Sequence, residues 1–268
     1  MRLKDKVILV TASTRGIGYA CVKACAKEGA VVYMAARDLE RAQATAEQLR
    51  AAGGRVKCVY NDATKPETFV TMVDQVVNDA GRIDVLVNNF GTSNRQRDLD
   101  FANTDPHVFL DTVTLNLQSV FLASQAAVRY MRKGGGGSII NISSVGGLVP
   151  DISQVAYGTS KAAINYLTRQ IAVHEAKNGI RCNAVLPGLI LSPEMDAYFS
   201  QDENMKAYFG TLKRQVVTQR THSTGEDIAN VVLFFADPVN EMVTGQQLIC
   251  DGGLSIHNPT WADLCGKF

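Results

Sequence analysis

The sequence predicts a doubly wound α/β fold, in which about seven parallel strands form one sheet with helices on both faces. Residues 7–10 form a continuous run of β-branched and leucine residues, as expected of a strand buried on both faces, and further strand-like runs recur along the chain. Segments with apolar residues at helical spacing separate these runs, and this alternation implies right-handed crossovers. The chain has 268 residues, of which 46% are hydrophobic, and no repeat or linker divides it. We therefore expect a single domain over residues 1–268.

The first unit shows how each element is assigned. Residues 7–10 form an apolar run that predicts a strand, and the apolar residues at 17, 20, 21, 24 and 25 then share one face of a helix. Two of these are Cys21 and Cys25, which we expect in the core. Further strands are expected at 31–35, 55–60, 83–87, 138–142, 180–185 and near 246–250. Helices are expected between them, at about 38–51, 66–80, 106–132, 156–177 and 226–236.

Composition and charge exclude several kinds of protein. The 27 basic and 26 acidic residues leave a formal charge of +1, which argues against an electrostatic nucleic-acid binder. No stretch approaches the roughly 20 apolar residues that cross a bilayer, and the amino-terminal apolar run is too short for a secretory signal. The sequence thus predicts a cytoplasmic protein with no membrane partner. Six scattered cysteines without a CxxC pair indicate reduced thiols, and four isolated histidines predict no metal site.

The segment 189–220 lies outside the strand–helix alternation. Its aromatic and aliphatic residues cluster on about half of a helical wheel, and it follows the carboxyl end of a strand, where open α/β sheets bind ligands. Two interpretations are open: a lid over a ligand-binding crevice, or an amphipathic helix packed on the core or on a second subunit. The sequence also leaves open whether the tail, 255–268, covers its own pocket or that of a neighbouring subunit.

Residues 11–18 (TASTRGIG) join the first strand to the first helix and indicate a nucleotide-binding loop. The N-terminus of a helix has unpaired N–H groups that suit a pyrophosphate, and Gly16 and Gly18 stand at that turn. Ala12 occupies the position of the usual first glycine, so the GxGxxG pattern is not met. The loop alone is therefore a weak signal.

The end of the second strand carries the evidence on cofactor type. A site for NAD places an acidic residue there to bind the ribose hydroxyls, whereas this chain has Ala36 and Arg37. The planar guanidinium of Arg37 suits a 2′-phosphate, and Arg15 in the loop is a second cation. These residues favour NADP. The alternative is that both arginines are solvated surface charges.

Tyr157 and Lys161 carry the signal for chemistry, because a spacing of four stacks them on one face of a helix. An ammonium group favours the phenolate, so we expect Lys161 to lower the pKa of Tyr157 from its usual value of about 10, with help from a positive nicotinamide. A tyrosine tuned in this way is a general acid/base near neutral pH. Ser143 and Ser144 follow the strand at 138–142 and lie at the sheet edge that binds ligands. The tyrosine–lysine spacing alone also occurs on ordinary helix surfaces.

Six motifs, in order along nearly the whole chain, resemble those of the short-chain dehydrogenase/reductase family. They are TASTRGIG at 11–18, NNFG at 88–91, LN at 115–116, NISS at 141–144, YGTSK at 157–161 and PG at 187–188. The resemblance implies a Rossmann-like fold and a catalytic tetrad. Tyr157 would be the acid/base, and Lys161 would lower its pKa and hold the nicotinamide ribose. Ser144 would orient the substrate oxygen, and Asn116 would hold a proton-relay water.

The resemblance also implies which residues bind the cofactor and how subunits assemble. The implied cofactor-binding residues are Ser13, Thr14, Arg15, Gly16, Ile17, Gly18, Arg37, Asp62, Ala63, Asn89, Gly91, Tyr157, Lys161, Pro187, Gly188, Ile190 and Ser192. Ala12 and Phe90 depart from the family pattern, and we expect them to narrow the cofactor site. The long helices at 106–132 and 156–177 would pair with other subunits in a homotetramer.

Further stretches resemble bacterial NADP-dependent bile-acid hydroxysteroid dehydrogenases of the 7α and 12α types. They are residues 11–18, 149–153 (VPDIS), 180–188 (IRCNAVLPG) and 258–260 (NPT). We expect oxidation of the 12α-hydroxyl of a bile acid, with the 7α-hydroxyl as the alternative. The runner-up activity is that of a 3-oxoacyl carrier-protein reductase or a general carbonyl reductase.

Two further questions stay open at this point. A catalytically idle dinucleotide-binding regulator is a hypothesis of another class, but such a protein has no use for the tetrad. Four basic residues near the expected site would either meet the bile-acid carboxylate or be solvated. They are Arg95, Arg97, Lys213 and Arg214.

Overall fold

The computed structural model describes residues 1–151, 154–191, 201–258 and 260. Within these residues seven strands form one parallel sheet in the order β3-β2-β1-β4-β5-β6-β7. The strands are β1 (Val7–Thr11), β2 (Val31–Ala36), β3 (Arg55–Tyr60), β4 (Val85–Asn88), β5 (Gly137–Ile142), β6 (Ile180–Pro187) and β7 (Gln247–Cys250). The predicted fold class is confirmed.

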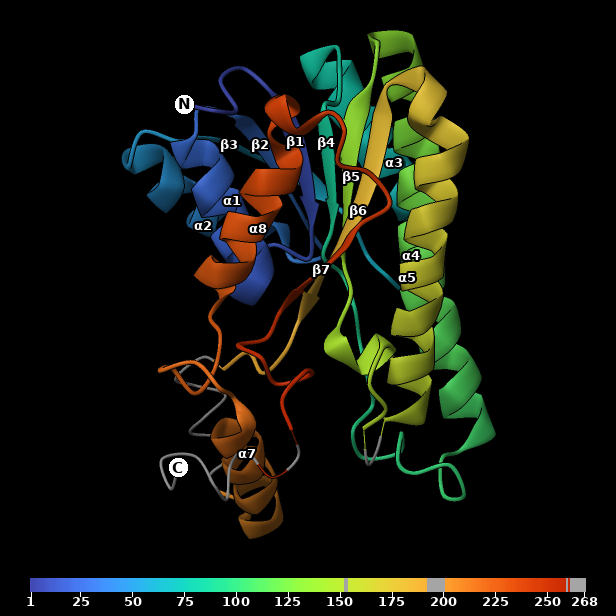
Figure 1. Ribbon diagram of the computed structural model, residues 1–268. Helices are drawn as coiled ribbons and strands as arrows, with labels where there is room; N and C mark the ends of the chain where they lie inside the picture. Colours follow the sequence, from blue (N-terminus) through green and yellow to red (C-terminus); the bar gives the residue numbers. More distant parts are fainter. Residues whose placement is uncertain (152–153, 192–200, 259, 261–268) are drawn as a thin grey trace.

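Helices cover both faces of this sheet (Figure 1). One face carries α1 (Gly16–Lys27), α2 (Leu39–Ala51) and α8 (Gly225–Ala236), and the other carries α3 (Thr68–Ala80), α4 (Pro106–Gly134) and α5 (Val155–Glu175). α7 (Glu203–Gln215) lies apart from both layers, below the sheet in Figure 1. Short 3-10 turns are η1 (Val145–Gly147), η2 (Ala176–Asn178) and η3 (Pro238–Asn240).

Burial on both faces of the sheet explains why residues 7–10 of β1 are all apolar. In β1, Ile8 and Val10 pack in the core beneath α1 and α8, whereas Val7 and Leu9 pack in the core beneath α3 and α4. Successive side chains of a strand point to opposite faces, so both sets must be apolar. Cys21 and Cys25 lie fully buried in the first of these cores, as expected. Their burial raises the pKa of both thiols.

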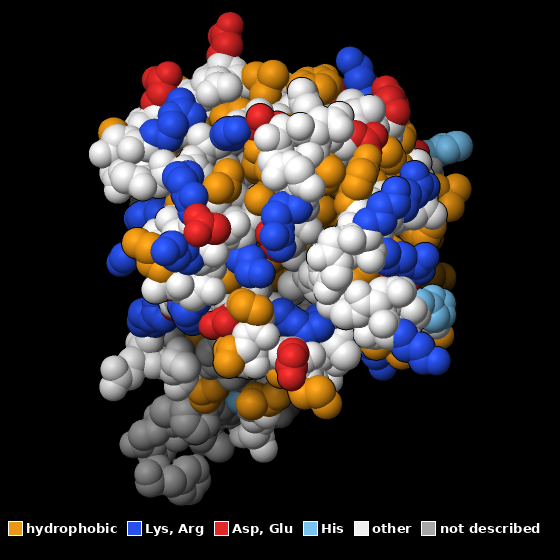
Figure 2. All heavy atoms as spheres, turned by 90° about the horizontal axis from the view of Figure 1, so that it is seen from above, with side chains coloured by type: hydrophobic (Ala, Val, Ile, Leu, Met, Phe, Trp, Pro, Cys, Tyr) orange, Lys and Arg blue, Asp and Glu red, His pale blue; other side chains and the backbone are white. Residues whose placement is uncertain are grey.

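The strand order places a switch point between β1 and β4. The chain leaves β1 toward β2 and β3 and then returns to the other side of β1 to form β4. The carboxyl ends of parallel strands share one edge of the sheet, and a crevice opens there at such a switch point. α7 and the loop that holds η1 lie at this carboxyl edge (Figure 1). The opposite, amino edge faces the viewer in Figure 2, where basic side chains are spread among apolar and acidic ones.

The observed element boundaries differ from the predicted ones by a few residues. α4 continues to Gly134 and ends there because Gly135 takes a left-handed conformation, with φ of 84°. β6 extends to Pro187, which carries the strand to the carboxyl edge. The segment 189–220 contains the predicted amphipathic helix, as α7, and its residues 192–200 lie outside the described part of the chain. Within that described part, no helix is long and apolar enough to cross a membrane.

Shortening a buried side chain at the centre of the sheet tests this account of the core. Leu9 is fully buried in β1, so we expect Leu9→Ala to lower the free energy of unfolding by about 2–5 kcal/mol, through lost burial and a cavity. Leu39 in the first turn of α2 is 38% exposed, and L39A should change it by no more than about 0.5 kcal/mol. Urea unfolding followed by circular dichroism measures both. Equal losses in the two variants would contradict the assignment of Leu9 to the core.

Candidate active site

Three of the four predicted catalytic residues meet at the carboxyl edge. Ser144 follows the end of β5, and Tyr157 and Lys161 lie in the first two turns of α5. The Ser144 hydroxyl lies beside the Tyr157 phenol and acts to lower its pKa. The Lys161 ammonium lies 5.5 Å from the centroid of the Tyr157 ring and donates to the Ile142 carbonyl at 2.9 Å. The spacing of four therefore does stack Tyr157 on Lys161.

The fourth predicted catalytic residue, Asn116, is connected to the site through Thr92 and Ser160. It is fully buried in α4, and its Oδ1 accepts from the Thr92 N–H at 2.8 Å. Its Nδ2 donates to the Thr92 carbonyl and to the Ser160 hydroxyl, both at 2.9 Å. Asn116 thus joins the loop after β4 to α5. Neither Thr92 nor Ser160 was predicted, because these partners lie 24 and 44 residues away in the sequence.

The electrostatics of the tyrosine differ from the prediction. Burial raises the pKa of Tyr157, and the hydrogen bond from Ser144 and the charge of Arg95 lower it by less. Burial also lowers the pKa of Lys161, to about 8. The expectation that Lys161 lowers the pKa of Tyr157 is wrong for the protein alone. The reason is desolvation, because the burial of Tyr157 outweighs the influences that lower its pKa.

The loop after β1 has the features of a phosphate cradle. α1 begins at Gly16 with no side-chain cap and no acidic residue in its first turn, so its N–H groups remain available to an anion. A Cβ on Gly18 would lie 2.6 Å from the Ala12 carbonyl oxygen, so only glycine fits there. The Ser13 hydroxyl is buried and has no hydrogen-bond partner within the described residues. These features fit a ligand that carries phosphate groups.

The two departures from the family pattern are accommodated differently. Ala12 adopts a left-handed backbone, with φ of 51°, and its carbonyl accepts from the Asn89 side chain at 3.0 Å. Phe90 packs edge-on against Phe69 of α3, with ring centroids 6.0 Å apart, in the core beneath α3 and α4. The Phe90 ring is thus partly buried against that core, and the narrowing of the cofactor site by Ala12 and Phe90 stays a prediction.

The remaining predicted cofactor residues line the carboxyl edge on either side of the switch point. Asp62 follows β3, and the charge of Arg37 is among the influences that lower its pKa, after hydrogen bonds from Thr64 and Tyr60. Gly91 approaches Lys161, since a Cβ there would lie 3.0 Å from Nζ. Thr14, Arg15 and Ile17 belong to the loop and the first turn of α1, Ala63 follows Asp62, and Pro187, Gly188 and Ile190 follow one another at the end of β6. Ser192 lies outside the described residues.

α7 contacts two loops at the carboxyl edge, the one after β4 and the one after β5. The Tyr208 hydroxyl donates to Asp151 in the loop after β5 at 2.7 Å. The Arg95 guanidinium, from the loop after β4, lies 5.9 Å from the centroid of the Phe209 ring. Phe209 is buried in one cluster with Leu189 and Leu191. Of the other basic residues, Arg97 pairs with Asp105, and Arg214 donates to Thr211.

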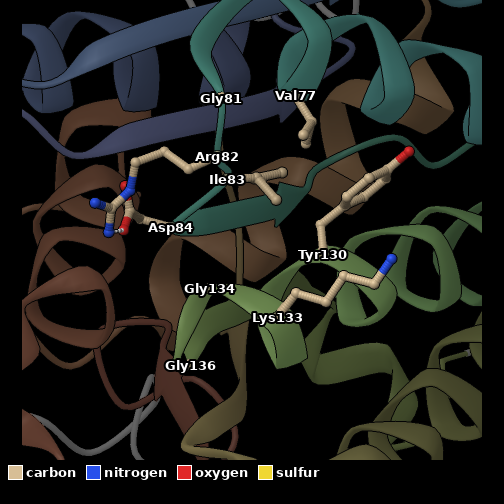
Figure 3. A pocket seen from close by; sticks show the side chains of 9 residues that line it. All are labelled: Val77, Gly81, Arg82, Ile83, Asp84, Tyr130, Lys133, Gly134 and Gly136. Atoms are coloured by element: carbon tan, nitrogen blue, oxygen red, sulfur yellow. Dashed lines mark hydrogen bonds and ion pairs between the residues drawn. The ribbon is translucent and has the colours of Figure 1, made fainter.

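A cavity of about 210 Å³ lies at the other end of the sheet (Figure 3). Ile83 and Asp84, just before β4, and Gly136, just before β5, are among its lining residues. In Figure 3 the Tyr130 and Lys133 side chains point one way and Arg82 the other, so they do not converge on one point. This cavity is separate from the candidate active site.

Comparisons with known proteins agree with this arrangement. A family model described as enoyl-(acyl carrier protein) reductase matches residues 11–255. A 7alpha-hydroxysteroid dehydrogenase of Clostridium sardiniense is 44% identical over 266 residues, covering 99% of each chain. One of Paraclostridium sordellii is 41% identical over 269 residues, covering 99% of this chain and 98% of its own. The solved structure of a gluconate 5-dehydrogenase from Burkholderia cenocepacia, in complex with NADP and tartrate, has a TM-score of 0.86 at 27% identity, covering 96% of this chain and 98% of that one.

The pKa of Tyr157 is open to direct measurement. In the protein without nucleotide we expect the phenol to ionise only above pH 10.0, the ordinary tyrosine value, because burial disfavours the phenolate. Subtracting the ultraviolet titration of Y157F from that of the wild type isolates this one phenol. Lys161→Met should move the ionisation little. Ionisation of Tyr157 below its ordinary pKa in the wild type, lost in K161M, would restore the prediction made from the spacing.

Proposed function

The chain belongs to the short-chain dehydrogenase/reductase family, and on that basis we propose that it is an NADP-dependent dehydrogenase for the 7α-hydroxyl of bile-acid steroids. The meeting of Ser144, Tyr157 and Lys161 at the carboxyl edge carries the proposal of alcohol and ketone chemistry. Two 7alpha-hydroxysteroid dehydrogenases that align over nearly the full chain support the choice of substrate. They favour the 7α alternative over the 12α position that the sequence analysis preferred.

The proton is proposed to move at the Tyr157 hydroxyl. During oxidation the phenolate takes the proton of the substrate alcohol, and during reduction the phenol returns it. Ser144 lies beside the Tyr157 hydroxyl, so both groups would hydrogen-bond to a substrate oxygen bound between them. Asn116 holds the Thr92 backbone against α5, and its role with a relay water stays a prediction.

The cofactor is proposed to extend from the α1 loop to Lys161. The N–H groups of α1 and the Ser13 hydroxyl would hold the pyrophosphate, and Arg37 with Arg15 would hold the 2′-phosphate. Lys161, beside Gly91, would hold the nicotinamide ribose. When bound, NADP supplies the redox chemistry by carrying the electron pair and hydrogen taken from the alcohol carbon. The NADP complex of the gluconate 5-dehydrogenase supports this choice of cofactor.

The steroid is proposed to lie between the catalytic residues and α7. Met205 and Leu212 of α7 are partly exposed beside the buried cluster of Leu189, Leu191 and Phe209, and such an apolar lining suits a fused-ring hydrocarbon. Arg95 influences the pKa of Tyr157 and lies over the Phe209 ring, so its charge is within the site. We assign it to the carboxylate of the bile-acid side chain. In this arrangement α7 acts as the lid.

The outer surfaces of α4 and α5 support the proposed homotetramer. Leu110 and Phe121 on α4 are 60% and 47% exposed, and Tyr166 and Val173 on α5 are 60% and 76% exposed. Exposed apolar side chains on neighbouring helices are typical of subunit interfaces. We propose that these helices pair between subunits. The cytoplasmic location also stays a prediction.

A panel of bile acids tests the proposed activity. With NADP, we expect the ultraviolet absorbance of the reduced nicotinamide to rise with bile acids that carry a 7α-hydroxyl, cholate included, and not with those hydroxylated only at positions 3 and 12. Y157F should lower the rate by about 10²- to 10⁴-fold, as expected for loss of a general acid/base. Turnover that follows the 12α-hydroxyl instead would overturn the 7α proposal. Turnover of acyl thioesters alone would favour the carrier-protein reductase.

A double substitution tests how NADP is selected. Ala36→Asp combined with Arg37→Ile replaces the partner of a 2′-phosphate with a partner for ribose hydroxyls, so the preference should move toward NAD. The ratio of kcat/KM for the two cofactors measures the change. A matched variant, Lys57→Ala, removes a cation in β3 that pairs with Asp79 and should leave the ratio unchanged. If the double variant keeps the wild-type ratio, Arg37 does not select the cofactor.

A further inference from the structure

The helix that carries Tyr157 and Lys161 has no cap of its own. Its N-cap residue, Gln154, has a left-handed backbone with φ of 66° and makes no capping hydrogen bond with its side chain. The first N–H groups of any helix have no partner within the helix and need one elsewhere when buried. In the first turn of α5, Ala156 is 0% exposed. The missing partners must come from another part of the chain.

Those partners come from one acidic residue 58 positions earlier in the sequence. Asp98, in the loop between β4 and α4, is 0% exposed. One carboxylate oxygen accepts from the Ala156 N–H at 2.8 Å, and the other accepts from the Tyr157 N–H at 3.0 Å. The Asp98 carbonyl accepts from the Gln154 N–H at 3.2 Å, and the next carbonyl, of Leu99, accepts from the Val155 N–H at 3.4 Å. Four successive N–H groups at the start of α5 thus bond to two residues of this loop.

The same loop is also attached to the site at its other end. Thr92 is held on both its N–H and its carbonyl by Asn116, and Asn116 donates to Ser160 in the first turns of α5. The Asp98 N–H donates to the Asn94 carbonyl at 2.7 Å, which closes a turn between the two attachments. A displacement of the loop therefore displaces the start of α5, and with it the catalytic tyrosine.

We propose that Asp98 is a positioning residue, which caps α5 and fixes the backbone of Tyr157 so that its hydroxyl meets Ser144. The inference rests on the proposed function only for its effect on turnover. A buried carboxylate that accepts two backbone N–H groups holds them more firmly than a neutral acceptor does, and a negative charge is favourable at a helix N-terminus. Asp98 touches neither reacting atoms nor cofactor, and it acts through the Tyr157 main chain.

Two substitutions of Asp98 remove this cap to different extents. D98A removes both acceptors, and D98N keeps one oxygen while turning an N–H donor toward a backbone N–H. A misplacement of about 1 Å can lower a rate 10²-fold, so we expect kcat to fall by about 10- to 100-fold in D98A and by less in D98N. The affinity for NADPH, measured by fluorescence titration, should change by less than kcat does, because the phosphate-binding loop after β1 and Arg37 are untouched. If D98A does not fold, the kcat of D98N tests the proposal in its place.

A matched cap elsewhere separates positioning from general stability. Thr224 caps α8, which packs with α1 on the other face of the sheet, in a capping box with Asp227. T224A should lower the melting temperature and leave kcat within about twofold of the wild type. A fall in kcat of the same size in T224A as in D98A would overturn the proposal, since the effect would then be one of stability. So would a D98A variant that keeps more than half of the wild-type kcat.

Hydrogen exchange tests the cap without any substrate. In D98A the amide protons of peptides that begin α5, residues 154–160, should exchange at least tenfold faster, while those of α8 stay as in the wild type. Unchanged exchange at the start of α5 would overturn the capping itself. If exchange accelerates but the wild type turns over no bile acid, the proposed function fails and the capping stands. If the wild type is active and exchange accelerates without loss of kcat, the positioning role fails and the proposed function stands.

Discussion

The buried ammonium of Lys161 is the interaction on which the geometry of the site depends. An amine that is 2% exposed needs a hydrogen-bond partner, and Lys161 finds one in the carbonyl of Ile142 at the end of β5. This bond holds α5 against β5 and so brings Tyr157 close to Ser144, the second residue after the strand. Gly147 permits the close approach, because a Cβ there would lie 2.7 Å from the backbone carbon of Lys161.

Burial sets the protonation of the two titratable groups in opposite directions. It raises the pKa of Tyr157 and lowers that of Lys161 to about 8, and both changes favour the neutral form. Arg95 is a cation among the influences on Tyr157, and it acts to lower the pKa of the phenol. A positive charge brought closer to the phenol would act in the same direction.

The loop between β4 and α4 connects the parts of the site. It carries Gly91 close to Lys161, Thr92 on Asn116, Arg95 beside α7 and Asp98 at the start of α5. This one irregular segment thus contacts α4, α5 and the candidate lid, α7. This loop therefore links α7 to Tyr157 through a short series of hydrogen bonds and packing contacts. The amino edge with its cavity has no part in this series.

Local features of the chain were predictable from the sequence by itself. Strand runs, helix periods and the four-residue spacing of Tyr157 and Lys161 depend on nearby residues, and the structure has each of them. The polar partners were decided only by the tertiary structure. Asp98 reaches Ala156 across 58 residues, and Asn116 reaches Ser160 across 44. The pKa of Tyr157 was mispredicted for the same reason, since desolvation depends on which distant segments fold against a side chain.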